Sequence, residues 1–171
     1  MFAIHLSSRR LLGPLAGAVL LLALVATADA KIVPQVGIGG AKIGKTQKQV
    51  RSKLGKPDRK QVLTSPIGGF DFVQLKYGRT KVSFDGTQKR SKVMAIFTKD
   101  ESERTESGVG VGSTKKQVKK GVAGAKCKKE FGVAHCWVGA FKPGRTVTDF
   151  RLHRKHGKLR VASVGVGLVL D

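Results

Sequence analysis

The sequence predicts an α+β protein of two tandem units, each with short helices packed on a small antiparallel β-sheet, after a cleaved signal peptide. Three observations lead to this prediction: an internal repeat, apolar–polar alternation between glycine turns, and the same helix-start motif at the head of each repeat. The expected boundaries are 1–30 for the signal peptide, 31–104 for the first unit and 105–171 for the second.

The N-terminal segment 1–30 has the three parts of a secretory signal peptide. Two arginines at 9–10 precede an apolar run at 11–25, and small residues at 28–30 form a cleavage site. The run is short for a membrane span and contains two glycines and a proline; the alternative is an uncleaved anchor. Cleavage after Ala30 leaves the segment 31–171, with Lys31 where a lipoprotein has cysteine. We expect a secreted or periplasmic, soluble protein without a transmembrane span in the mature chain.

The rest of the chain contains an internal repeat. Three pairs of segments match in the same order and at nearly the same offset along the chain. The pairs are 43–50 with 111–118, 78–84 with 144–150, and 92–93 with 158–159. One match can arise by chance, but three in order at nearly one spacing indicate a tandem duplication.

Each unit is expected to open with a helix of two turns. In the first unit Thr46 is the N-cap, Val50 and Leu54 share one face, and Gly55 and Pro57 end the helix. In the second unit the corresponding features are Ser113 or Thr114, Val118, Val122, Gly121 and Gly124. Because such short helices are marginal alone, they must pack against strands.

Three strands are expected in each unit. They are 70–76, 80–84 and 92–98, then 136–141, 146–154 and 158–170. Turn signals at 77–78 and 85–86 favour an antiparallel meander. Gly165 and Gly167 predict a bulge or close packing in the last strand. The charged segment 99–107 is predicted to be an exposed linker.

Both cysteines, Cys127 and Cys136, lie in the exported part of the chain. An even number in an oxidising compartment predicts one disulfide, worth somewhat under about 3 kcal/mol for so short a loop. The alternative is a metal site with His135, but two cysteines and one histidine leave a tetrahedral set incomplete. Trp137 is expected to pack on the disulfide; the alternative is a binding anchor.

The segment 39–46 fits the phosphate-loop pattern G-x-x-x-x-G-K-[ST] letter for letter. It can equally be a glycine turn and a threonine cap before a short helix. The matching segment 111–114 keeps the glycine and the threonine but not the lysine. A phosphate loop also precedes a substantial helix, whereas the helix expected after Thr46 has only two turns. We therefore expect a turn and a cap, and no cofactor site.

No set of residues in the sequence indicates catalysis or metal binding. His153 and His156 have no obvious third ligand, and Asp71, Asp85 and Asp149 are isolated carboxylates. His135 beside Cys136 suggests a thiol–imidazole pair, but a disulfide-bonded sulfur cannot act as a nucleophile. We therefore predict a protein that is not an enzyme, with no catalytic, cofactor-binding or metal-binding residues.

Positive charge is the main indication of a partner. The whole chain has 33 basic and 11 acidic residues; removal of two arginines and one aspartate with the signal leaves a net charge of +21. Such a protein is attracted to anionic lipid headgroups, wall polymers and, nonspecifically, nucleic acid; the alternative is a solvated, solubilising surface. The candidate polyanion contacts are Lys115, Lys116, Lys119, Lys120, Lys126, Lys128 and Lys129.

The repeated pattern Ile/Val-Gly-x-Thr-x-x-Gln-Val, followed at 54–57 by Leu-Gly-Lys-Pro, resembles a motif of two protein families. They are the small lipoprotein of the outer-membrane β-barrel assembly machine and the secreted β-lactamase inhibitor protein. The resemblance implies a helix pair on a small antiparallel sheet, present twice in the inhibitor, and a disulfide after the helix of a unit. The first unit lacks cysteines, and no inhibitor contact residue matches here, so β-lactamase inhibition is not implied.

Two functions are compatible with these features. The first is a secreted non-catalytic binding or scaffold module that binds an envelope or extracellular protein through its sheet face. The alternative is a polyanion, membrane-surface or cell-wall binder driven by positive charge.

Overall fold

The computed structural model describes residues 31–66, 68–130 and 132–170. The predicted signal peptide lies outside the described residues. The described chain forms two helices and eleven strands. In order they are β1 (Ile32–Val33), β2 (Gly37–Ile38), β3 (Ala41–Lys42), α1 (Gln47–Leu54), β4 (Arg59–Thr64), β5 (Asp71–Tyr77), β6 (Thr80–Phe84), β7 (Val93–Thr98), α2 (Lys115–Gly121), β8 (Lys126–Glu130), β9 (Val133–Val138), β10 (Thr146–Lys155) and β11 (Lys158–Leu168).

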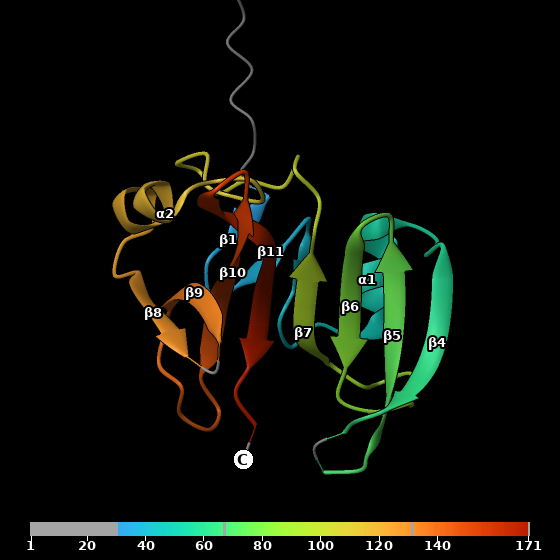
Figure 1. The fold of residues 1–171 in the computed structure, drawn as a ribbon. Helices are drawn as coiled ribbons and strands as arrows, with labels where there is room; N and C mark the ends of the chain where they lie inside the picture. Colours follow the sequence, from blue (N-terminus) through green and yellow to red (C-terminus); the bar gives the residue numbers. More distant parts are fainter. Residues whose placement is uncertain (1–30, 67, 131, 171) are drawn as a thin grey trace, which may run out of the picture.

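Eight of these strands form one antiparallel sheet in the order β4-β5-β6-β7-β11-β10-β9-β8 (Figure 1). The prediction of two units with separate small sheets is therefore wrong, because the protein is mostly β and its main sheet is continuous. The halves join where Val164 pairs with Thr98 and Gly167 pairs with Ala95. Separate meanders would leave the backbone groups of β7 and β11 unpaired at this edge, and joining the sheets satisfies them.

The start of each helix is attached in the same way to the last strand of its own half. In both halves two backbone hydrogen bonds of 2.7–2.8 Å make the attachment. They make Val161 the structural equivalent of Val93, in place of Leu159, which the sequence repeat had matched with Val93. The bonds are Gly44 N to Val93 O, Val93 N to Lys45 O, Gly112 N to Val161 O and Val161 N to Ser113 O.

Both helices begin at the predicted threonines, each with a capping box. The Thr46 hydroxyl accepts from the backbone N–H of Gln49, and the Gln49 side chain accepts from the Thr46 N–H at 3.0 Å. Thr114 and Gln117 repeat this arrangement, with the corresponding side-chain contact at 2.8 Å. These contacts satisfy backbone donors that a helix start leaves free.

The N-terminal segment forms a second, three-stranded sheet that the sequence analysis did not predict. Ile32 and Ile38 are fully buried in the core. Gln35 has φ of 62° and crosses to β10, where its backbone N–H donates to the Thr148 hydroxyl at 2.6 Å and its side chain donates to the Thr146 carbonyl at 3.2 Å. Residues of the first predicted unit therefore pack against strands of the second.

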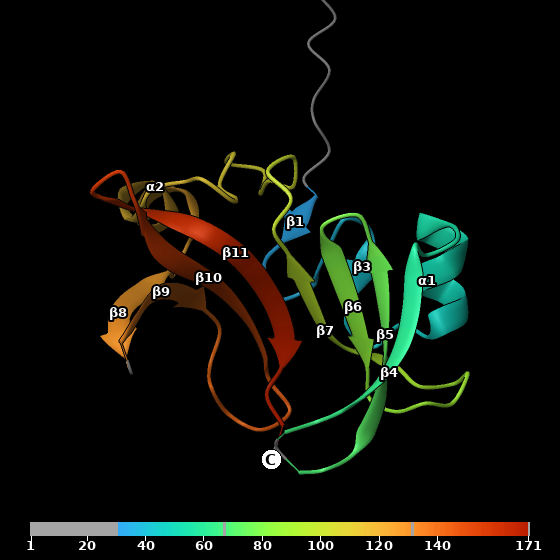
Figure 2. The ribbon, with the colours of Figure 1, turned by 45° about the vertical axis from the view of Figure 1, so that its right-hand side comes forward.

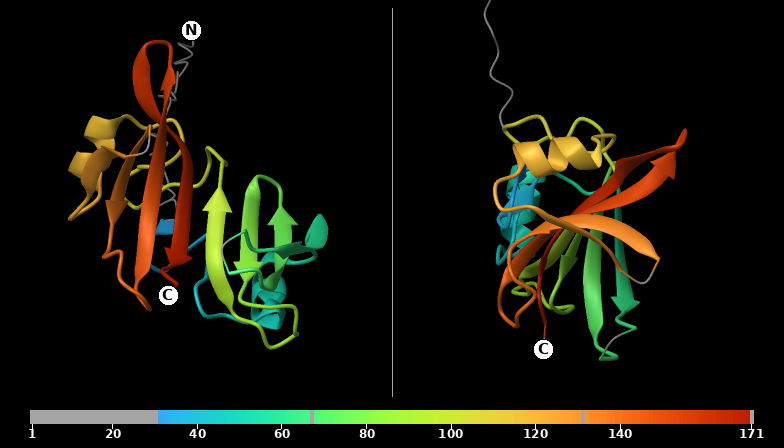
Figure 3. Two further views of the ribbon diagram at one scale, coloured as in Figure 1. Left: turned by 60° about the horizontal axis from the view of Figure 1, so that its bottom comes forward. Right: turned by 60° about the vertical axis from the view of Figure 1, so that its left-hand side comes forward.

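The main sheet is covered on one face by α1, α2 and the small sheet (Figures 1 and 2). A single core lies beneath them, because buried side chains of both halves belong to one cluster. Its largest fully buried members are Phe84, Phe150, Ile32, Ile38, Leu75 and Ile96. The β10–β11 hairpin extends past the end of its neighbours, and its tip stands clear of the sheet (Figure 3).

The observed strands differ from the predicted ones at both edges of the sheet, at both ends of β9, at the bulge of the last hairpin and at the end of β11, which is Leu168 and not 170. The edge strands β4 and β8 were not predicted, because their exposed charged residues obscure the apolar alternation. Strand β9 ends at Val138 and not at 141, since Gly139 adopts φ of 105°. The register of the last hairpin shifts between Arg151 and Leu152, opposite Ala162 of β11, and not at Gly165 or Gly167. A Cβ atom on either glycine would make only ordinary contacts, at 3.8–4.0 Å.

The segment 99–107 is not exposed throughout, contrary to the prediction of an exposed linker. Glu103 and Thr105 are buried. The Thr105 backbone N–H donates to the Val109 carbonyl at 2.8 Å, which closes a turn over the core.

Candidate functional site on the open face of the sheet

The second face of the main sheet is open, since no described helix lies over it (Figures 1 and 2). Side chains alternate between faces along a strand, so residues opposite each other in the register share a face. On β9 and β10 the open-face residues are His135 and Trp137, paired with Arg151 and Asp149. The antiparallel register thus brings together two pairs of residues that the β9–β10 connection separates in the sequence.

His135 is the centre of a polar network on this face. Its Nδ1 lies 2.8 Å from Asp149 Oδ1, and its Nε2 lies 3.6 Å from Glu130 Oε2. Arg151 Nε donates to Asp149 Oδ2 at 3.3 Å, and Lys128 Nζ lies 2.7 Å from Glu130 Oε1. The His135 side chain is only 14% exposed although it lies on the open face. The network therefore holds the imidazole in a fixed orientation.

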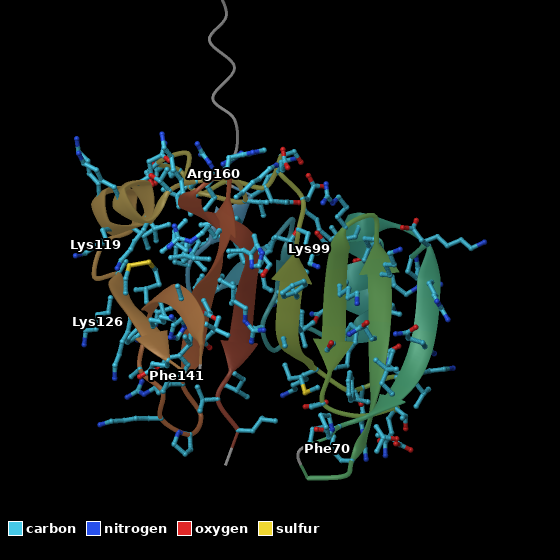
Figure 4. The ribbon with its side chains drawn as sticks, viewed as in Figure 1. Phe70, Lys99, Lys119, Lys126, Phe141 and Arg160 are labelled. Carbon is cyan, nitrogen blue, oxygen red and sulfur yellow. A yellow bond between two sulfur atoms is a disulfide. The ribbon has the colours of Figure 1, made fainter. Side chains whose placement is uncertain are left out.

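Trp137 stacks on the His135 ring. The ring centroids are 4.9 Å apart and the planes differ by 26°. Phe141 follows β9, and its ring centroid lies 5.8 Å from that of Trp137. Phe141 is 58% exposed (Figure 4). The expectation that Trp137 packs on the disulfide is wrong, because Cys136 and Trp137 are adjacent in one strand and point to opposite faces.

The charge of Glu130 is stabilised in this network. Lys128 donates a hydrogen bond to its carboxylate, which holds the pKa of Glu130 below its ordinary value. His135 contributes in the same direction. Glu130 and Asp149 thus place a carboxylate at each imidazole nitrogen.

A histidine held by an aspartate can orient a general base, but such chemistry also needs a nucleophile or substrate group at the other nitrogen. Among the described residues no serine, threonine or cysteine donates a hydrogen bond to His135 Nε2. The described part of the chain likewise contains no group of three or more histidine, cysteine or acidic residues that could hold a metal ion. The site is a rigid surface of aromatic and charged groups, and such a surface is suited to binding a partner.

The predicted disulfide between Cys127 and Cys136 is present. The two cysteines are paired across β8 and β9, with Cα atoms 4.0 Å apart. The bond links the edge strand β8 to the rest of the sheet on the covered face. His135 lies on the other face, which separates it from both sulfur atoms.

All seven lysines of the predicted polyanion contacts are exposed, but the sheet divides them. Four are on α2, over the covered face. Lys126 (Figure 4) and Lys128 lie on the open face, because they pair with Trp137 and His135. Lys129 pairs with Ala134 and lies on the other face. Within the described chain Lys128 is the one member of this set with an ion pair.

The open face of the first half carries a ladder of uncharged polar side chains. Gln61 Nε2 donates to Gln74 Oε1 at 3.3 Å, and Gln74 Nε2 donates to Ser83 Oγ at 3.1 Å. This neutral ladder crosses β4, β5 and β6. The same face also carries the Phe70–Phe72 ring pair, with centroids 6.3 Å apart, and a row of three paired cations, Arg59, Lys76 and Lys81. Among the described residues the imidazole–carboxylate network is therefore what distinguishes the second half, although the two halves share their helix starts.

The phosphate-loop pattern is divided between two structural features. Gly39 and Gly40 form the turn between β2 and β3, with φ of 61° and 93°. Thr46 caps α1 through its hydroxyl. The segment is therefore a hairpin turn followed by a helix cap, as the sequence analysis favoured.

The remaining predicted residues do not form a site. His153 and His156 lie in the exposed β10–β11 hairpin, and His156 is at the turn with φ of 48°. Asp149, considered isolated in the sequence, is instead a member of the His135 network. The two helices of the described chain are too short to span a membrane.

No protein-family model matches the chain, and no curated protein matches it. Two solved structures are similar. The uncharacterized protein yfeY from Escherichia coli superposes with a TM-score of 0.51 at 14% identity, over 78% of this chain and 97% of that one. A DUF4309 family protein (YjgB) from Bacillus subtilis subsp. subtilis str. 168 gives a TM-score of 0.43 at 18% identity, over 81% and 88%. The similarity to yfeY shows a shared fold and no more, so the function has to be inferred from the residues of this chain.

Proposed function

We propose that the protein is an exported, non-catalytic binding module whose open sheet face holds a protein partner. The observation that carries this proposal is the group formed by Trp137, Phe141 and Arg151 beside the fixed His135 ring. Tryptophan and arginine are enriched among the residues that dominate binding energy at protein interfaces. A site on paired strands also loses little conformational entropy on binding.

Export is part of this proposal. The disulfide is in keeping with an oxidising compartment, and the sequence at 1–30 has the pattern of a signal peptide cleaved after Ala30. Descent of the two halves from one duplicated ancestor, related to the inhibitor and assembly-lipoprotein families, also remains a proposal. The shared helix caps and the equivalent backbone bonds at the two helix starts support the duplication.

Affinity capture from the native envelope or culture fluid tests the binding function. The wild-type protein should retain a specific protein at moderate salt. The Trp137→Ala variant should bind that protein about 30-fold more weakly, as expected for loss of a residue that dominates an interface. Lys119→Ala, an exposed substitution on α2, is the matched control and should bind normally. Equal capture by the Trp137→Ala and wild-type proteins would contradict the proposal.

A second candidate function is binding to an anionic surface, favoured by the four exposed lysines of α2. Changing Lys115, Lys116, Lys119 and Lys120 to glutamate should strongly reduce retention on vesicles containing anionic lipid. The matched control changes the exposed Lys45, Lys48, Lys53 and Lys56 near α1 to glutamate, which alters the net charge equally. Equal loss in both variants indicates attraction by net charge, and unchanged retention removes the α2 lysines from consideration.

A further inference from the structure

Glu103 is a buried residue with one carboxylate oxygen that has no hydrogen-bonding partner in the part of the chain that the structure describes. The residue is 9% exposed, and its Oε2 is buried with no donor within hydrogen-bonding distance among the described residues. A buried carboxylate is strongly unfavourable unless a donor or a cation compensates for its lost hydration. The described chain therefore leaves one strong acceptor unused in a protein that is rich in cations.

The carboxylate lies against the N-terminal segment. A Cβ atom on Gly39 would be 2.8 Å from Glu103 Oε1, so the carboxylate occupies the space beside that glycine. The Gly39 N–H donates to the Lys31 carbonyl at 2.7 Å, and the Ile32 N–H donates to the Arg104 carbonyl at 2.8 Å. Strand β1 thus starts beside the loop that follows β7 (Figure 2). Both Lys31 and Glu103 border Gly39.

We propose that cleavage after Ala30 creates the missing partner, because the new α-ammonium group of Lys31 pairs with the Glu103 carboxylate. This inference rests on the proposed export and on the cut at that bond. In the uncut chain the same nitrogen is a neutral amide. In the processed chain it is an amine with an ordinary pKa of about 8, and it is therefore mostly charged at neutral pH.

The electrostatic surroundings of Glu103 favour such a partner. Burial raises the pKa of Glu103, and the nearby Asp100 carboxylate raises it further. The side-chain ammonium of Lys31 acts in the opposite direction, which places Lys31 within electrostatic range. A second positive charge on the same residue would add to this effect and favour the ionised carboxylate.

The consequence is that processing stabilises the folded protein. Pairing fixes β1, and Gln35 connects the same segment to β10. Removal of the signal would therefore strengthen the attachment of the small sheet to both halves of the main sheet.

The test compares two products of export of the full chain. One is the natural protein, and the other carries Gly-Ser inserted between Ala30 and Lys31, which moves the α-ammonium group away from Lys31 by the length of the insert. Mass spectrometry establishes the cut, and urea unfolding at pH 7 measures stability. We expect the unfolding equilibrium constant of the natural product to be about tenfold lower than that of the extended product, because one hydrogen bond to a charged group contributes an effect of this size.

Glu103→Gln should have opposite effects in the two products. It should increase the unfolding constant of the natural product by removing the ion pair, and decrease that of the extended product by removing an unpaired buried charge. Glu101→Gln changes an exposed carboxylate in the same loop and should leave the tenfold difference intact. A Glu103→Gln effect of the same sign in both products would overturn the inference.

NMR titration of the Glu103 carboxyl carbon tests the inference without a substitution, should the variants fail to fold. The pKa of Glu103 should be lower in the natural product than in the extended one, and equal values would overturn the proposal. A natural cut at another bond would also overturn it. None of these outcomes affects the capture experiment with Trp137→Ala, so failure of this inference is distinguishable from failure of the proposed partner binding.

Discussion

Thr80 and Thr98 face each other across β6 and β7 with their hydroxyl oxygens 2.8 Å apart, and both side chains are buried. Replacing Thr80 removes the Thr98 hydroxyl's partner across the sheet, but Thr98 still accepts from the Asp100 backbone N–H at 3.0 Å, so the cost lies at the lower end of about 1–3 kcal/mol. We therefore expect Thr80→Val to lower the free energy of unfolding by that amount, measured by urea denaturation. The double variant Thr80→Val/Thr98→Val should lose less than the sum of the two single changes. Additive losses would show that the hydroxyl groups are not coupled.

The raised pKa of Glu103 gives a second prediction at this scale. Because the folded state binds this proton more tightly than the unfolded state, the protonated side chain contributes stability that is fully present below about pH 4.5 and lost as pH rises through the folded pKa. In the Gly-Ser extended product the advantage of Glu103→Gln over wild type should therefore shrink as pH falls from 7 to 4.5. A difference that does not vary with pH would contradict this assignment.

Some site residues were predictable from the sequence and others were not. The Cys127–Cys136 bond was predicted because the chain has only two cysteines. The His135–Asp149 contact depends on which residues of β9 and β10 lie opposite each other, and turn length and bulges set that register. Spacing in the sequence does not contain this information, so Asp149 was interpreted as isolated.

At the scale of elements, each capping box should contribute similarly to stability. Thr46→Ala and Thr114→Ala each remove a hydroxyl acceptor from a helix start, which typically lowers the free energy of unfolding by about 1 kcal/mol. The two losses should add, since the helices share no partner. Thr87→Ala, an exposed change in a loop, should alter stability by less than about 0.5 kcal/mol. Thermal or urea unfolding that shows no loss in either helix variant would contradict this account.

Replacing a glycine in β11 by alanine should stabilise the protein, in contrast to the helix-cap substitutions. A Cβ atom on Gly167 would lie 3.8 Å from the Ala95 Cβ, an ordinary contact, and Gly167 is not in the left-handed region. Gly167→Ala should therefore stabilise the protein by about 0.4–1 kcal/mol, because it restricts the unfolded chain. Gly37→Ala is the control at a position that has no room for a Cβ atom, since this atom would overlap the Ala41 carbonyl oxygen. This variant should destabilise the protein in the same urea assay.

The difference between predicted and overlooked strands has a physical reason. Strand β6 lies between two partners and has a run of buried residues, so its bounds Thr80–Phe84 were predicted correctly. Strands β4 and β8 have one partner each, and charged residues on an outer strand protect its free edge from other chains. The features that suit a strand to an edge thus remove the apolar pattern that would identify it.

At the scale of the whole molecule, the continuous sheet predicts one cooperative unfolding transition. The chain has a single tryptophan, Trp137 in the second half, and a single tyrosine, Tyr77 in the first. Because both halves share one core and the β7–β11 pairing, the two chromophores should report the same urea midpoint. Separate midpoints would show that the halves unfold independently, as the predicted two-unit architecture implies.

The repeat in the sequence identified the three inner strands of each half, but neither the edge strands β4 and β8 nor how the halves combine. Matching segments at 43–50 and 111–118 form equivalent helix starts, as expected. The pairing of β7 with β11 joins the last strands of the two halves, which are distant in the sequence, and neither strand carries a local signal for its partner. Tertiary pairing between repeats therefore decided the fold class.

The anchoring of Gln35 to β10 has a consequence for the order of folding. The Gln35–Thr148 hydrogen bond joins positions 113 residues apart, so the small N-terminal sheet is fixed only when β10 is present. Contacts between distant parts of a chain form slowly, since a long loop must close first. The small sheet therefore reaches its final position late, and a chain without β10 cannot complete this core.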